Sequence, residues 1–144
     1  FQAEDGIRDF CLSRGLGDVY KRQDMAVKSA IEINAKTEEL NKEFKNKGLN
    51  LPPINVGTGV NTGTCIVGKL GSQSRFDSPV IGDAVNLAAR LEATAARGQF
   101  LDYKTIVSKE TKEQVGEGYV FEDIGTIKVK GKEEEINIYY PKML

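Results

Sequence analysis

Two side chains with complementary chemistry stand four residues apart in the sequence: the carboxamide of Asn86 and the guanidinium of Arg90. The run around them is predicted to be helical, and helical residues four apart project from the same face. A guanidinium offers a fixed fork of donors to phosphate oxygens, and a carboxamide both donates to and accepts from a sugar hydroxyl. The pair therefore predicts a site for an anionic ligand that carries a sugar. The alternative is an ordinary solvated helix face, which the spacing alone would favour.

The composition excludes several classes of chemistry. The 144 residues contain no histidine, which rules out Ser-His-Asp and Cys-His catalysis, imidazole bases and histidine-containing zinc sites. Twenty Lys and Arg against 21 Asp and Glu give a formal net charge of -1, so we expect no nucleic-acid partner. Cys11 and Cys65 do not make a disulfide framework and favour a reducing compartment. No apolar run approaches the roughly 20 residues of a membrane-spanning helix.

Two helices must position these side chains. Asp24 is predicted to cap a first helix over 24–47, and Asp83 a second helix over 83–97, each followed by a glycine that ends it. The first helix has apolar or small residues at steps of four and three, which predicts one buried stripe. The stripe consists of Ala26, Ala30, Ile33, Thr37, Leu40 and Phe44.

The strand signals surround the second helix. Residues 54–60 alternate with a period of two, and turn residues separate them from a second run over 64–70, so a hairpin is predicted. Gly57 and Gly59 leave one face of the first strand bare, which permits the close approach of another backbone or of a ligand.

The remaining elements complete the fold prediction. A polar loop is expected over 71–78, a short strand over 105–107, a brief helix capped by Ser108, and a terminal hairpin of 127–130 with 136–140. This order predicts an α+β sandwich in which helices pack on a mixed or mostly antiparallel sheet.

Residues 1–23 differ from the rest of the chain. Charges and glycines interrupt their apolar pairs, and neither a period of 2 nor one of 3.6 is sustained. The string FQAEDGIRDFCLSRGLGDVYKRQ resembles a translated sequencing adaptor. We therefore expect a non-native or disordered arm over 1–23 and a folded domain over 24–144. A native irregular arm is the alternative.

Four motifs in fixed order extend the reading beyond single residues. They are Asn61-Thr62-Gly63, Gly68-Lys69-Leu70-Gly71-Ser72, Val80–Glu92 and Ile127-Lys128-Val129-Lys130-Gly131-Lys132. In order and spacing they resemble the catalytic domain of the class III adenylate and guanylate cyclases, from about Asp24 to Pro141. The resemblance implies a ferredoxin-like cyclase-homology sandwich that lacks its first strands.

The resemblance implies roles for three side chains. Asn86 matches the asparagine that orients the ribose in the transition state, and Arg90 matches the arginine that stabilises charge on the phosphoryl group. Lys130 matches the lysine that contacts the triphosphate. The implied reaction is in-line attack of the substrate's own 3′-hydroxyl on its α-phosphorus, which expels pyrophosphate. This chemistry needs no histidine.

The family's two metal-binding aspartates lie upstream of this core and hold two divalent cations, Mg²⁺ or Mn²⁺. Only weak counterparts occur here: Asp5 resembles the first metal strand, and Gly17-Asp18 resembles the second turn. We therefore assign no metal ligand and expect this chain alone to be inactive or nearly so.

Base recognition is implied at Pro79, seven residues before Asn86, where adenylate cyclases of the family usually present Asp or Thr. Proline has no polar side chain and no N–H, so a backbone carbonyl, such as that of Val80, would have to meet the base. ATP is favoured over GTP as the substrate, and the choice between them stays open.

The resemblance also implies partners and a setting. Sites form between two domains, with metals from one and the Asn, Arg and Lys from the other, so a homodimer is expected. A cytoplasmic location and a role in intracellular signalling are implied, with sensor or membrane segments possible upstream. A second hypothesis is a non-catalytic cyclase-like module for nucleotide binding or dimerisation, which Pro79 favours. A third is a purely structural α+β domain.

Overall fold

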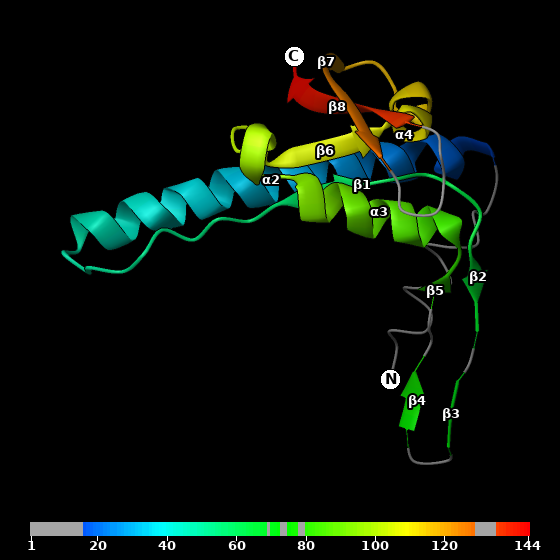
Figure 1. Cartoon of the computed structure of the whole chain (residues 1–144), viewed down its shortest axis with the longest axis horizontal. Helices are drawn as coiled ribbons and strands as arrows, with labels where there is room; N and C mark the ends of the chain where they lie inside the picture. Colours follow the sequence, from blue (N-terminus) through cyan, green and yellow to red (C-terminus); the bar gives the residue numbers. More distant parts are fainter. Residues whose placement is uncertain (1–15, 69, 73–74, 78–79, 129–134) are drawn as a thin grey trace.

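The computed structural model describes residues 16–68, 70–72, 75–77, 80–128 and 135–144. In chain order the elements are α2 (Leu16–Asn46), β1 (Thr58–Val60), β2 (Ile66–Val67), β3 (Leu70–Ser72), β4 (Arg75–Asp77), β5 (Val80–Ile81), α3 (Asp83–Thr94), the 3-10 turn η1 (Gly98–Phe100), β6 (Thr105–Ser108), α4 (Lys109–Gln114), β7 (Tyr119–Lys128) and β8 (Glu135–Met143). Helices pack on a largely antiparallel sheet, which confirms the predicted α+β class (Figure 1).

One four-stranded sheet, in the order β1-β6-β8-β7, forms the centre of the fold. β1 runs parallel to β6, whereas β8 pairs antiparallel with both β6 and β7. β7 and β8 confirm the predicted terminal hairpin, although the expected turn at Gly131 lies outside the described residues. The pairing shifts register between Asp123 and Gly125, where Gly125 adopts a φ of +108° that favours glycine.

The two long helices cover opposite faces of this sheet, because neighbouring residues of a strand point to opposite sides. Ile106 of β6 packs in one buried cluster with Leu91 of α3. The next residue, Val107, packs in a second cluster with Val27 of α2. The fold therefore has three layers, with α2 on one side of the sheet and α3 on the other (Figure 1).

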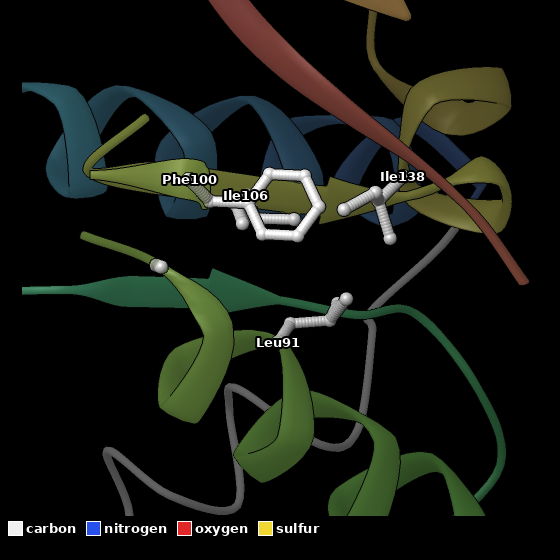
Figure 2. Close-up of a cluster of buried hydrophobic side chains, with 5 residues drawn as sticks. Leu91, Phe100, Ile106 and Ile138 are labelled. Carbon is white, nitrogen blue, oxygen red and sulfur yellow. The ribbon is translucent and has the colours of Figure 1, made fainter. Parts of the chain in front are cut away.

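A single leucine anchors the α3 layer. Leu91 is fully buried and points at Ile106 and Ile138 of the sheet, and Phe100 from η1 closes the cluster (Figure 2). Full burial of such a side chain stabilises the fold by roughly 1.5–3 kcal/mol. The cluster determines which face of α3 is turned toward the sheet.

Glycines bring α3 into direct backbone contact with the β1 segment, as the bare strand face predicted. A Cβ at Gly59 would lie 2.3 Å from the backbone nitrogen of Glu92, and one at Gly57 would lie 2.6 Å from the carbonyl oxygen of Ala95. Real side chains do not tolerate such distances to backbone atoms, so only glycine fits at these positions.

The start of α2 differs from the prediction. The helix begins at Leu16, so Asp24 lies inside it and is not its N-cap. Asp24 instead accepts a hydrogen bond on Oδ1 from the Gly116 amide at 2.9 Å. The buried Gln23 donates from Nε2 to Gln114 Oε1 at 3.2 Å. Contacts with the α4 region thus support a helical turn where the apolar pattern gave no signal, since packing outweighs local propensity.

The end of α2 agrees with the prediction to within one residue. The helix ends at Asn46, and Gly48 follows with a φ of +70°. The assignment of residues 1–23 to a separate arm stays a prediction, because 1–15 lie outside the described part and 16–23 are helical. Among the described helices, none is long and apolar enough to cross a lipid bilayer.

The buried stripe of α2 is rotated relative to the predicted one. Val27, Ala30 and Asn34 face the sheet, whereas Ile33 and Leu40 are 48% and 38% exposed. The sequence pattern selected the large apolar residues, but the sheet surface opposite α2 is partly polar. A helix with small and polar residues on its inner side matches that surface better.

The polar part of this interface is a buried hydrogen-bond network. Asn34 donates from Nδ2 to Thr105 Oγ1 at 2.6 Å and to Thr58 Oγ1 at 3.3 Å. The two threonine hydroxyls lie 2.9 Å apart on the paired strands β1 and β6. Asn34 Oδ1 has no hydrogen-bond partner among the described residues. The network fixes α2 along the sheet through polar contacts, because a buried donor needs an acceptor.

The hairpin predicted from 54–60 and 64–70 does not form, because β1 pairs with β6 and not with β2. Instead, β2 pairs with β5, and β3 pairs with β4 across the segment predicted as a polar loop over 71–78. These short antiparallel pairs form a projection, from β2 to β5, that extends away from the sheet (Figure 1). At its base, Ile66 and Ile81 are 72% and 56% exposed.

The short elements after α3 mostly match their prediction. β6 confirms the strand over 105–107, and Ser108 caps α4 by accepting a hydrogen bond on Oγ from the Thr111 amide at 3.2 Å. α3 itself ends at Thr94, earlier than predicted, and Ala96 then adopts a positive φ of 57°. The helix ends there because the chain must turn back into the core at Phe100.

Candidate functional site

The first turn of α3 is held by a glycine and not by a capping side chain. Gly82 has a φ of +154°, and its carbonyl oxygen accepts from the Val85 amide at 3.0 Å and the Asn86 amide at 3.2 Å. A Cβ at Gly82 would lie 3.3 Å from the Thr64 carbonyl oxygen. Asp83 was predicted as the cap but is the first helical residue, where a carboxylate is favourable near the positive end of the helix dipole.

Asn86 and Arg90 are both exposed, and they lie one helical turn apart on α3. Their neighbours Leu87 and Leu91 pack into the core, so the pair borders the buried stripe of the helix. Both side chains thus lie outside the hydrophobic interior, and their role as a functional pair stays a prediction. A rigid helix whose opposite side is anchored thus presents an amide and a guanidinium together.

Arg90 reaches across the sheet edge to the end of β7. Its Nη2 donates to the carbonyl oxygen of Lys128 at 3.4 Å. Lys128 is the last residue of β7, and Lys130 follows it two positions later in the sequence but lies outside the described residues. The contact brings α3 and the end of β7, which are distant in sequence, to one place. Sequence reasoning missed it, because no spacing rule links residues 38 positions apart.

One of the two residues implied in base recognition lies at the end of the β2–β5 projection, just before α3. Val80 is in β5, opposite Val67, and its side chain is 39% exposed. Pro79 lies outside the described residues. Val80 therefore stands two residues before the glycine at which α3 begins, and its role in base recognition stays a prediction.

The described residues do not supply a metal-ligand set. Within the described ranges, no three His, Cys, Asp or Glu side chains come together in a group that could hold a metal ion. Asp5 lies outside these ranges, and Gly17 and Asp18, which were only a weak counterpart of the family's second turn, lie in the first turn of α2. Two divalent cations at a family-type site would need carboxylates beyond those described here.

A residue behind α3 also belongs to the site, although sequence reasoning used it only as a turn signal. Asn61 donates from Nδ2 to the carbonyl oxygen of Ala84, in the first turn of α3, at 2.9 Å. A Cβ at Gly63 would lie 2.6 Å from the Ala84 Cβ, so the segment after β1 presses against that turn. The motif Asn-Thr-Gly was the available signal, but its spacing suggested a hairpin.

The shifted pKa values among the described groups belong to residues outside α3: burial raises the pKa of Tyr119, and the other shifts arise in hydrogen-bonded pairs near the surface. Hydrogen bonds from Lys142 and then from Tyr103 lower the pKa of the Glu122 carboxyl. A hydrogen bond from Lys104 lowers the pKa of the Glu38 carboxyl. These pairs join α2, β7 and β8 to the segment before β6, and they act on the scaffold rather than on the exposed pair of α3.

Sequence comparisons point in one direction. The sequence model of the "Adenylate and Guanylate cyclase catalytic domain" matches residues 9–142. The chain is 32% identical over 143 residues to the terminal-differentiation specific adenylate cyclase of Dictyostelium discoideum, covering 93% of this chain and 6% of that protein. It is 34% identical over 124 residues to an adenylate cyclase of Anabaena cylindrica, covering 83% of this chain and 24% of that protein. The chain thus spans a quarter or less of these relatives.

Solved structures agree with the sequence comparisons. The adenylyl cyclase CyaB from P. aeruginosa superposes with a TM-score of 0.73 at 30% identity, covering 90% of this chain and 61% of that chain. The guanylyl cyclase Cya2 superposes with a TM-score of 0.63 at 31% identity, covering 83% of this chain and 58% of that chain.

Proposed function

The chain belongs to the family of adenylate and guanylate cyclase catalytic domains, and on that premise we propose that it supplies Asn86 and Arg90 to a cyclising site. The substrate is a purine nucleoside triphosphate, ATP in preference to GTP, and the products are the 3′,5′-cyclic monophosphate and pyrophosphate. Support for ATP comes from the adenylate cyclases among its relatives, against which the similarity to a guanylyl cyclase must be weighed.

The observation that carries the proposal is the joint exposure of Asn86 and Arg90 on a helix whose other side is buried through Leu91. In the proposed reaction the 3′-oxygen loses its proton to solvent and forms a bond to the α-phosphorus. The bond from that phosphorus to the α–β bridging oxygen of the triphosphate breaks, and this oxygen leaves as part of pyrophosphate. Arg90 places positive charge beside the oxygens that gain negative charge, and Asn86 holds the ribose so that its hydroxyl is in line. Lys130 is proposed to contact the leaving phosphates.

The metal ions of the reaction require a second domain. Because the described residues do not form a ligand set, we propose that a partner copy of the family fold brings the carboxylates to the face of α3. The partner is expected to be a second cyclase domain in a homodimer of a longer protein. On its own, the chain 1–144 is expected to release little or no pyrophosphate from ATP or GTP.

A second candidate function is a cyclase-like module that binds nucleotide or mediates dimerisation without catalysis. Pro79 favours this candidate, since proline offers no donor to a purine base. For either candidate function we propose that the domain lies in the cytoplasm, as part of a signalling protein. The reason is that the family takes its nucleotide substrates from the cytoplasm.

A complementation assay tests the proposal directly. The chain is joined by a flexible linker to an adenylate cyclase domain of the family that retains its metal aspartates but carries alanine in place of its own asparagine and arginine. The linker raises the effective concentration, so that pairing does not depend on affinity. Neither half is expected to be active alone, whereas the linked protein should produce cyclic nucleotide with Mg²⁺ or Mn²⁺.

The matched control is the same linked protein with Arg90→Ala, which should lose most of that activity. Cyclic AMP and cyclic GMP are measured separately, so that the preferred base is read in the same experiment. If the paired protein binds ATP or GTP but forms neither product, catalysis by this chain is excluded and the binding module remains. Strong metal-dependent pyrophosphate release by unlinked 1–144 would contradict the expectation that a second domain is required.

A further inference from the structure

Two asparagine side chains bridge the β1 segment to α3, one near each end of the helix. Asn61 donates from Nδ2 to the carbonyl oxygen of Ala84 at 2.9 Å. Asn55 donates from Nδ2 to the carbonyl oxygen of Ala96 at 3.3 Å. Both hydrogen bonds end on backbone, so they hold the helix itself and do not depend on any side chain of α3.

The spacing of these two hydrogen bonds fits the geometry of the two elements. Six residues of extended chain separate Asn55 from Asn61, which corresponds to roughly 20 Å at about 3.3 Å per residue. Ten helical residues separate Ala84 from Thr94, which corresponds to roughly 15 Å at 1.5 Å per residue, and Ala96 lies two residues beyond the end of the helix. The segment runs antiparallel to α3, so the two asparagines meet opposite ends of it. An axial shift of α3 would break both contacts.

The segment between the two asparagines offers little side-chain resistance of its own to such a shift, so the packing of Leu91 against the sheet is the other restraint on α3. Gly57 and Gly59 face α3 there, and they present bare backbone to the helix. A glycine surface sets how close the helix comes, but it has no Cβ to interlock with the helix along its axis. Among the described residues, the structure shows two side-chain hydrogen bonds from this segment to the α3 region, and the amides of Asn55 and Asn61 donate them. These two hydrogen bonds fix the position of α3 along its axis.

The Asn61 contact is the one nearest to the functional pair. Asn86 is two residues after the carbonyl group that Asn61 holds, whereas Asn55 acts beyond the far end of the helix. Asn61 Oδ1 is buried and has no hydrogen-bond partner among the described residues. A buried acceptor without a partner is unfavourable, so packing alone does not explain an asparagine at this position. The hydrogen bond that its Nδ2 donates does explain it.

We propose that Asn61 is a positioning residue for the cyclisation reaction: it fixes the first turn of α3 along the helix axis, and thereby the placement of Asn86 and Arg90. The proposal rests on the proposed function of that pair. In-line displacement is sensitive to small errors of placement, and a shift of about 1 Å can lower the rate about 100-fold. Loss of the Asn61 donor should therefore act on turnover more than on substrate binding.

The test compares two substitutions of equal size at the two ends of α3. Asn61→Asp and Asn55→Asp each replace a donor by an acceptor that faces a carbonyl oxygen, with almost no change of volume. In the linked protein described above, Asn61→Asp should lower kcat about 10- to 100-fold while KM changes less than about 3-fold. Asn55→Asp should leave kcat within about 3-fold of the parent value.

Stability and amide exchange keep the test independent of the activity. Thermal unfolding is measured for both variants, and Asn61→Ala, which adds no repulsion, takes the place of Asn61→Asp if the latter does not fold. Hydrogen exchange of the α3 amides is measured by mass spectrometry on the unlinked chain. Exchange in the first turn of α3 should become faster in the Asn61 variant and remain unchanged there in the Asn55 variant.

Each outcome decides one of the two proposals. A folded Asn61 variant with unchanged kcat, or an equal fall of kcat in both variants, would overturn the positioning role. Unchanged first-turn exchange in the Asn61 variant would overturn it as well. An inactive linked protein with wild-type Asn61 would instead remove the proposed function, and the exchange result would still decide whether Asn61 anchors α3.

Discussion

The two helices that cover the sheet are attached to it in different ways. α3 lies directly on the backbone of the β1 segment, with Leu91 fully buried beneath it. α2 contacts the sheet through smaller and polar residues, among them Ala30 and Asn34, and leaves Ile33 largely exposed. The difference shows where the fold requires accuracy. The helix that carries the functional pair is held at backbone distance, whereas the other is held by a hydrophobic cluster around Val27 and by a buried polar network.

This difference also separates what each helix tolerates. A helix at backbone distance cannot accept even one extra methyl group at the contact, because a close-packed interior has no free volume. A helix held by hydrogen bonds loses stability in smaller steps, because each bond contributes about 1 kcal/mol net. The loss of stability that a substitution causes should therefore differ between the two sides of the sheet, and the following variants measure that difference.

The largest effect is expected from Gly59→Ala. Its new Cβ would lie 2.3 Å from the Glu92 nitrogen and 2.6 Å from the Ala88 carbonyl oxygen, both backbone atoms of α3. We expect a loss of more than about 4 kcal/mol in the free energy of unfolding, or no folded protein. The control is Gly68→Ala, where a Cβ meets nothing within 4 Å. Equal urea midpoints for the two variants would show that α3 can move away from the strand at little cost.

The next effect is on activity and leaves the fold intact. Arg90→Ala removes an exposed side chain that donates a hydrogen bond of 3.4 Å to the Lys128 carbonyl oxygen, so the melting temperature should hardly change. In the linked cyclase protein, kcat should fall about 10²- to 10³-fold, the range for loss of one donor to a developing charge. Arg90→Lys should recover only part of it, since an ammonium lacks the planar fork. An unchanged kcat in Arg90→Ala would remove this arginine from its assigned role.

A smaller effect distinguishes the inner from the outer side of α2. Asn34→Ala removes the donor to Thr105 and Thr58 and should lower the free energy of unfolding by about 1–2 kcal/mol. Ile33→Ala, at the neighbouring and exposed position, should stay within about 0.5 kcal/mol. The measurement is chemical unfolding followed by circular dichroism. The reverse order would restore the apolar stripe that the sequence predicted.

The sequence was informative where one physical effect dominated locally. Ser108 before α4 and Gly48 after α2 act on backbone groups close to them in sequence, and both are confirmed. The bare face of Gly57 and Gly59 correctly predicted a close approach, although the pattern alone did not specify that α3 makes it. The predicted start of α2 was wrong, because Asp24 bonds to Gly116 and does not cap the helix. That contact spans 92 residues, so no local pattern could predict it.

The site was predictable in its residue types but not in its supports. Helical spacing alone placed Asn86 and Arg90 on one face, and the structure leaves both exposed. The hydrogen bond from Asn61 to Ala84 depends instead on the path of the chain after β1, which the hairpin signal predicted wrongly. Turn residues in sequence do not reveal whether their side chains serve the turn itself or a neighbouring helix.

The smallest expected effect is the loss of stability at low pH, and it compares two hydrogen-bonded carboxylates on the two sides of the sheet. The Glu122 carboxylate accepts from Lys142 at 2.6 Å and from Tyr103 at 3.2 Å, whereas Glu38 on α2 accepts from Lys104 at 2.8 Å. Both pKa values lie below the ordinary 4.5, so each pair stabilises the fold above that pH and loses its effect as the pH falls through the lowered value.

Because these groups are exposed or only half-buried, solvent and salt screen them, and the shifts in melting temperature should be small. Glu122→Gln should lower the melting temperature at pH 7 more than Glu38→Gln does, since Glu122 accepts two hydrogen bonds. The difference between each variant and the parent should shrink below pH 4.5 and in 1 M NaCl. If the melting temperatures of Glu122→Gln and of the parent still differ at pH 2, the charge of the carboxylate is not what stabilises this edge of the sheet. The shape of the side chain would then be what stabilises it.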